Sequence, residues 1–184
     1  MDISKLQKTI KECIPLVVKE WNDVKLKEFN KLFEKSFFEY FNNRQTQEKT
    51  KIVSPIIDVL FSRIMSEKLP DFIIDEGNGK DYRYGDLELE KKLTLSVGNS
   101  WTGNGYNKVG YHILSKFDMN DYGHITSYFS CLVNLDECLS GWSKPKNSNF
   151  SSLKFLNGDI SKITPIHGSV NESTKYLAFK LVGV

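Results

Sequence analysis

The sequence predicts an α+β protein in which N-terminal helices pack on a mixed central β-sheet. Apolar residues recur at helical spacing through roughly the first 69 residues, whereas period-two alternation and β-branched runs dominate from about residue 70. Helices and strands in separate blocks are typical of this class. Because no linker or repeat interrupts the chain, residues 1–184 are expected to form one domain, helical over about 1–69 and sheet-rich over about 70–184.

The first two predicted helical segments precede residue 42. Residues 2–20 carry one apolar side, with an interruption expected at Pro15. Residues 24–41 carry a broad stripe of leucine and phenylalanine. The polar stretch 42–51 is expected to be a loop or a frayed helix end.

A third helix is predicted to start at Ser54-Pro55, because a capping hydroxyl followed by proline suits the first helical turn. Its apolar residues follow at helical spacing until Leu69-Pro70 ends the segment.

The strongest strand signal is Gly85–Val97, read as GDLELEKKLTLSV. Its odd positions are apolar apart from Lys91, and its even positions are polar. A helix would pair Glu88 with Lys92 but would scatter the apolar residues around its axis. The segment is therefore predicted to be the central strand, with one apolar and one polar face.

Shorter patterns predict the rest of the sheet. Strands are expected at 71–76, 111–117, 124–135 and 175–184, with loops at 98–110 and 140–152. A helix is the alternative for 111–117.

Composition argues for an ordinary globular chain that works inside the cell. Of its 184 residues 40% are hydrophobic and 26% charged, and the net charge is +2. No apolar run approaches the roughly 20 residues of a membrane helix, and the N-terminal residues lack the pattern of a secretory signal. The three cysteines form neither a disulfide framework nor a metal spacing, so we expect an intracellular protein with no membrane partner.

Two carboxylates and a lysine converge on the central strand. Glu90 and Lys92 are two residues apart and share a face, and Asp81 lies nine residues before Glu90 in a glycine-rich segment that can fold back beside the strand. Such a group can hold a divalent cation and a polarised water, which phosphodiester hydrolysis requires. The alternative is a solvated strand face with alternating charges.

The motif D-x8-E-x-K, formed by Asp81, Glu90 and Lys92, resembles the signature of the PD-(D/E)xK nuclease superfamily, in particular small type II restriction endonucleases. The resemblance implies a restriction-endonuclease-like fold and Mg2+-dependent cleavage of double-stranded DNA at a short site by a homodimer. It also implies that Asp81 and Glu90 bind the metal and that Lys92 positions the attacking water. The sequence departs from the family where Lys80 replaces the proline that often precedes the first acid.

Two other aspartates are candidates for the first metal-binding acid. Asp75 ends the preceding strand and is the runner-up to Asp81, while Asp86 is about 13 Å from Glu90 at strand rise, too far to share one ion. Glu88 is expected on the active face, where it can bind a second ion or a ligating water.

Two polar segments are candidate DNA contacts. The segment after the central strand combines glycines, which admit close backbone approach, with side chains that can meet bases or phosphates. Its candidates are Trp101, Thr102, Asn104, Tyr106, Asn107 and Lys108, and a second loop offers Lys144 and Lys146. The alternatives are an ordinary hairpin anchored by Trp101 and an exposed loop.

Other chemistries find little support. His112, His124 and His167 are scattered without a zinc spacing, and no serine or cysteine nucleophile motif occurs. The rival functions are a repair nuclease or junction resolvase of the same superfamily, and a non-catalytic DNA-binding or interaction module.

Overall fold

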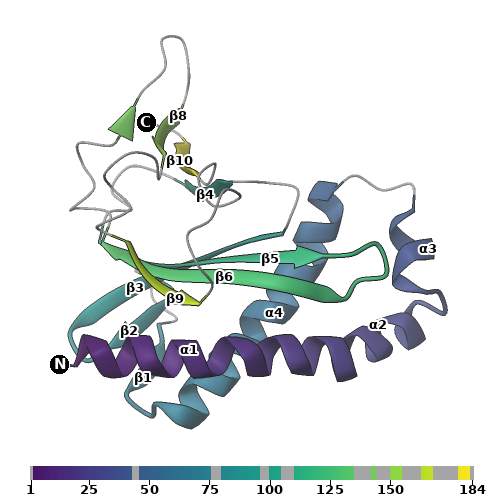
Figure 1. The fold of residues 1–184 in the computed structure, drawn as a ribbon, viewed down its shortest axis with the longest axis horizontal. Helices are drawn as coiled ribbons and strands as arrows, with labels where there is room; N and C mark the ends of the chain where they lie inside the picture. Colours follow the sequence, from purple (N-terminus) through teal and green to yellow (C-terminus); the bar gives the residue numbers. More distant parts are fainter. Residues whose placement is uncertain are drawn as a thin grey trace.

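The computed structural model has an α+β architecture in which every described helix precedes every described strand (Figure 1). The structure describes residues 2–42, 46–75, 80–95, 100–104, 110–134, 142–143, 150–154, 163–167 and 178–182. The α+β class and the helix-first order are confirmed.

The helices form the N-terminal part of the chain. They are α1 Ile3–Glu20, the π-helix η1 Trp21–Lys25, α2 Leu26–Leu32, α3 Phe37–Phe41 and α4 Thr46–Lys68. No described helix combines the length and apolar character needed to cross a membrane.

The strands form two sheets instead of the single predicted sheet. The six-stranded sheet has the order β1-β2-β3-β5-β6-β9, in which only β3 and β5 pair in parallel. Its strands are β1 Phe72–Ile74, β2 Tyr82–Tyr84, β3 Leu87–Leu95, β5 Tyr111–Met119, β6 Ile125–Asn134 and β9 Ile163–His167. Helices α1 and α4 contact one of its faces, and Figure 1 shows the smaller sheet on the side away from α1.

The smaller, four-stranded sheet corrects two loop predictions. Its order is β4-β10-β8-β7, with β4 Ser100–Asn104, β7 Trp142–Ser143, β8 Phe150–Lys154 and β10 Ala178–Val182. Strand β4 lies in the predicted loop 98–110, while β7 and the start of β8 lie in the predicted loop 140–152. These short strands lack a long alternating pattern and gain their partners in the tertiary structure: β10 pairs with both β4 and β8, and β7 pairs with β8. Strand β9 was not predicted.

Two helix predictions were also wrong because of a proline: the interruption of α1 at Pro15 and the start of α4 at Ser54-Pro55. Helix α1 continues through Pro15, since the neighbouring Ile14 and Val17 are buried in the core and offset the missing hydrogen bond. Helix α4 begins at Thr46, so Ser54-Pro55 lies inside the helix and does not cap it. Val53 and Ile57 are both fully buried, which carries the apolar side of α4 across the exposed Pro55.

The predicted stripe over residues 24–41 is divided between α2 and α3. The chain turns at Glu34, which has a positive φ of 52°. Ser36 then starts α3 in a reciprocal capping arrangement with Glu39.

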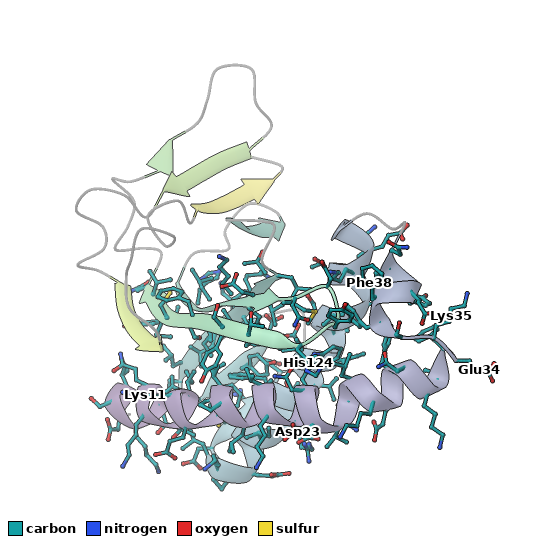
Figure 2. The ribbon with its side chains drawn as sticks, turned by 45° about the vertical axis from the view of Figure 1, so that its right-hand side comes forward. Lys11, Asp23, Glu34, Lys35, Phe38 and His124 are labelled. Atoms are coloured by element: carbon teal, nitrogen blue, oxygen red, sulfur yellow. The ribbon has the colours of Figure 1, made fainter. Side chains whose placement is uncertain are left out.

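The tip of the β5–β6 hairpin docks against the π-helix. Trp21 Nε1 donates to the Gly123 carbonyl at 2.8 Å, and the Asn22 amide exchanges two hydrogen bonds with the backbone of Ile125 at 2.8 and 3.0 Å. Figure 2 shows Phe38 and His124 where α3 meets this turn, with the exposed Asp23 on the outer side of the helix. The hairpin is therefore attached to the helical layer at its turn as well as along its length.

Candidate active site

Strand β3 separates two environments, as its alternation predicts. Leu89 and Leu95 face the helices and belong to the main hydrophobic core, with 0% and 3% exposure. We call the opposite side, which carries Glu88, Glu90 and Lys92, the polar face. The five apolar odd positions predicted for this segment reach Val97, which lies outside the described residues.

Asp81 lies beside Glu90 on the polar face. The β2–β3 register pairs Tyr82 with Leu89, so that one further step places Asp81 opposite Glu90. The Lys91 backbone N–H donates to Asp81 Oδ2 at 2.8 Å, which holds the aspartate against β3. Directly opposite residues on neighbouring strands have Cβ atoms about 5 Å apart. Asp81 therefore lies next to Glu90, where the sequence analysis expected the first acid.

The strand register also distinguishes Asp81 from Asp75 and Asp86, the other candidates for the first acid. The Asp75 N–H donates to the Asp81 carbonyl at 3.1 Å, so Asp81 lies between Asp75 and Glu90. Asp75 is therefore two strand spacings, about 10 Å, from Glu90. Asp86 was expected on the central strand, but it lies with Gly85 in the turn that precedes β3. Of these three aspartates, Asp81 is the one adjacent to Glu90.

Glu90 and Lys92 form an ion pair on the polar face. Lys92 Nζ is 2.5 Å from Glu90 Oε1, and the two side chains are 21% and 0% exposed. Burial of a carboxylate without a partner would be very unfavourable, and the Lys92 ammonium is a partner for Glu90 there. The alternation put these residues on one face; the sequence did not predict that Glu90 would be fully buried.

Lys91 faces the helices, and its role was missed by the sequence reasoning. Its side chain is 2% exposed, and its ammonium pairs with Asp58 of α4 and lies 4.7 Å from the centroid of the Phe61 ring. Burial, followed by the neighbouring Lys92, lowers the pKa of Lys91. Asp58 is one helical turn before Phe61 and Ser62, a position that could have signalled a partner facing the sheet.

His112 joins the site through the parallel strand β5. It is paired in register with Glu90 and is 0% exposed. Its Nδ1 lies 2.9 Å from the Gly110 carbonyl oxygen. Burial lowers the pKa of His112 to about 4, with Lys80, Glu90 and Lys92 also acting on the ring. The sequence analysis gave this histidine no partner, because the spacing of residues along the chain does not show which strands pair.

Glu88 lies on the polar face, as expected, but is exposed and sits opposite Arg83 of β2. Glu88 and Arg83 are therefore directly opposite residues of opposite charge on neighbouring strands.

The predicted DNA contacts are described only in part. Trp101, Thr102 and Asn104 lie in β4, whose backbone alone is described. Tyr106, Asn107, Lys108, Lys144 and Lys146 lie outside the described residues.

The polar face has oxygen donors suited to a hard cation. Mg2+ often takes only one or two protein carboxylates and keeps water as its other ligands, which Asp81 and Glu90 can satisfy. Across the described part of the chain, no three His, Cys, Asp or Glu side chains gather closely enough to hold an ion. The donor set therefore fits a two-carboxylate site and not a protein cage.

No protein-family model, curated protein or solved structure matches this chain.

Proposed function

We propose that this protein is a Mg2+-dependent endodeoxyribonuclease of the PD-(D/E)xK type, with a restriction-endonuclease-like fold. The observation that supports it most is the adjacency of Asp81 and Glu90 on neighbouring strands with Lys92 paired to Glu90 on the same face. Asp81 and Glu90 would hold the metal. Lys92 would position the attacking water and stabilise the negative charge that develops on the phosphate.

The division of labour follows from charge. A phosphodiester repels carboxylates, and a bound Mg2+ would supply the positive charge that lets the two meet. Asp81 uses one carboxylate oxygen on the Lys91 N–H, which fixes its orientation and leaves the other for an ion. Lys92 retains a partly exposed side chain, so its ammonium can face both Glu90 and a substrate.

The proposed substrate is double-stranded DNA, cut at a short specific site by a homodimer as in type II restriction endonucleases. The exposed Arg83 and the partly exposed Lys80 flank Asp81, where they can meet phosphate oxygens. A two-fold dimer presents the same chemistry to both strands of a palindromic site. The segments with Asn104, Asn107 and Lys108, and with Lys144 and Lys146, are the proposed DNA contacts outside this site.

The test is cleavage of phage DNA by the purified chain with Mg2+, mapped at the cut ends, against EDTA. Asp81→Asn, Glu90→Gln and Lys92→Met are expected to lose cleavage while keeping a wild-type circular dichroism spectrum. Lys19→Met and Glu67→Gln, on exposed positions of α1 and α4, are the matched controls and should cut normally. Wild-type cleavage by Glu90→Gln or Lys92→Met, or a wild-type chain that never cuts, would overturn the proposal. Preference for branched or damaged DNA would instead identify a repair nuclease or resolvase.

The full burial of Glu90 favours a second candidate, a non-catalytic DNA-binding or interaction module. In that case the Glu90–Lys92 pair only stabilises the sheet. Equal DNA binding in Mg2+ and EDTA, without any cleavage, would support this candidate.

A further inference from the structure

We propose that the edge of β1 is the surface on which a second copy of this chain docks, so that the two copies join their six-stranded sheets there with both polar faces on one side. The inference deepens the proposed function and rests on it for the use of the dimer, because it names the surface that would hold the two proposed sites together.

Strand β1 is an edge strand of the six-stranded sheet, and one of its peptide groups is directed away from that sheet. The Asp75 N–H donates to the Asp81 carbonyl, so the alternation of an antiparallel pair directs the N–H and C=O of Ile74 outward. The N–H of Phe72, which also points outward, donates to the Leu69 carbonyl at 2.8 Å. Two copies related by a two-fold axis at Ile74 would exchange both hydrogen bonds of an antiparallel pair at this residue.

The side chains at this edge are apolar and exposed. Ile73 on the polar face and Ile74 on the helix side are 48% and 50% exposed, and Val59 of α4 is 67% exposed. Val59, Ser62 and Ile74 line a hollow of about 700 Å3 between α4 and β1. An exposed apolar edge is a template for pairing with another chain. The two-fold axis would bring Ile74 of each copy beside the hollow of the other and remove this apolar surface from water.

Charge complementarity favours a second copy as the partner. Arg83 lies opposite Ile73 on the polar face and makes no ion pair within the described part of the chain. The axis at Ile74 would place Asp75 of the second copy on the other side of Ile73, two strand spacings or about 10 Å from Arg83. The long arginine stem can cross Ile73 and bring the guanidinium to this carboxylate. Symmetry forms the contact twice, and the five N–H groups of each arginine leave donors for a phosphate.

The same dimer suits cleavage of both DNA strands. An axis perpendicular to the joined sheet keeps the two polar faces on one side, with the strand order β3-β2-β1-β1-β2-β3 across the interface. The midpoints of the two Asp81–Glu90 pairs are then four strand spacings, about 20 Å, apart. This is the scale on which phosphates face each other across a B-DNA groove, the major groove itself being about 12 Å wide. A dimer through α1 and α4, which contact the opposite face, would direct the two sites away from each other.

The experiment is sedimentation equilibrium of the purified chain without DNA. Ile74→Lys should raise the dimer dissociation constant at least about 100-fold, because symmetry places the substituted residue twice in the interface. Arg83→Asp should raise it about tenfold. Adding Asp75→Arg to Arg83→Asp exchanges the two charges and should return the constant to near the wild-type value. Leu32→Lys, at a 76% exposed position of α2, is the matched control and should dimerise normally.

A monomeric wild type, or wild-type dimerisation of Ile74→Lys, would overturn the inference. Loss of the dimer in Leu32→Lys would place the interface on α2 and overturn it as well, as would the absence of rescue by the charge exchange. If Ile74→Lys loses the wild-type circular dichroism spectrum, Arg83→Asp and its rescue carry the test. DNA cleavage is assayed separately: a dimer through this edge that never cuts overturns the proposed function alone. A wild-type chain that cuts as a monomer overturns the inference alone.

Discussion

Lys91 and Lys92 are consecutive residues that lie on opposite faces of β3, with their ammonium groups paired to different acids. Lys91 pairs with Asp58 beneath the sheet, and Lys92 pairs with Glu90 on the polar face. Strand geometry separates them completely, although the sequence presents them as one dilysine. The two lysines should therefore respond to substitution in different ways.

Cleavage should depend on Lys92 and not on Lys91. Lys92→Met removes the group proposed to act on the attacking water and should reduce the cleavage rate at least about 100-fold. Lys91→Met should stay within a few-fold of wild type, because its side chain contacts α4. Single-turnover cleavage at saturating Mg2+ measures both rates. Equal loss in the two variants would contradict the separation of faces.

The Lys91–Asp58 pair should be asymmetric in stability. Asp58→Asn leaves a buried ammonium without its counter-charge and should lower the free energy of unfolding by roughly 3 kcal/mol. Lys91→Met should cost much less, because the Asp58 side chain is 44% exposed and can be hydrated. Urea denaturation of the two single variants and the double variant measures the difference, and the double variant should resemble Lys91→Met. A larger loss in Lys91→Met than in Asp58→Asn would refute this account.

Gly123 should resist substitution far more than Gly85, although both have positive φ. An added Cβ at Gly123 would lie 2.5 Å from Phe37 Cγ and 2.8 Å from Leu26 Cδ1, whereas at Gly85 nothing lies within 4 Å. Gly85→Ala should cost only the strain of a left-handed backbone, about 1 kcal/mol. Gly123→Ala adds a steric clash and should cost about 3 kcal/mol in all. Thermal denaturation ranks the two, and a smaller loss for Gly123→Ala would show that the hairpin tip is not held against α3.

Asn22 should contribute to stability through the β5–β6 hairpin. Asn22→Ala removes both hydrogen bonds to the Ile125 backbone and should cost about 2 kcal/mol in chemical denaturation. Asn42→Ala, at an exposed position, is the matched control and should stay near wild type. An equal loss at the two positions would argue against the docking of the hairpin on the π-helix.

His112 should make stability depend on pH in a defined window. Its pKa is about 4 in the fold and about 6.5 in the unfolded chain, so the unfolded state binds more protons between these values. Stability from this group is therefore complete above pH 6.5 and is lost as the pH falls to 4, by on the order of 3 kcal/mol. The wild-type free energy of unfolding should fall more steeply over this range than that of His112→Asn. The carboxylates titrate in both proteins, so the difference between the two profiles isolates the contribution of His112. Parallel pH profiles would disprove the neutral imidazole.

Local sequence patterns were sufficient to predict the helices and strands whose conformation depends mainly on their own residues. The alternation around Leu89 and Glu90 predicted both the strand and its two faces, because side-chain direction in a strand follows directly from sequence position. The end of α4 near Leu69-Pro70 was predicted for a similar reason, since proline acts on its immediate neighbours. The starts of α4 and of the smaller sheet were missed, because packing around Val53 and pairing with β10 outweighed local signals.

The sequence by itself determined the chemistry available to this protein: an aspartate, a glutamate and a lysine at a spacing that a returning strand can bring together. Only the tertiary structure decided which aspartate adjoins Glu90, that Glu90 is fully buried beside Lys92, and that His112 lies opposite Glu90 on β5. The physical reason is that strand register, which no local spacing encodes, determines which side chains meet across a sheet. It is the pairing of β2, β3 and β5 that assembles this candidate site.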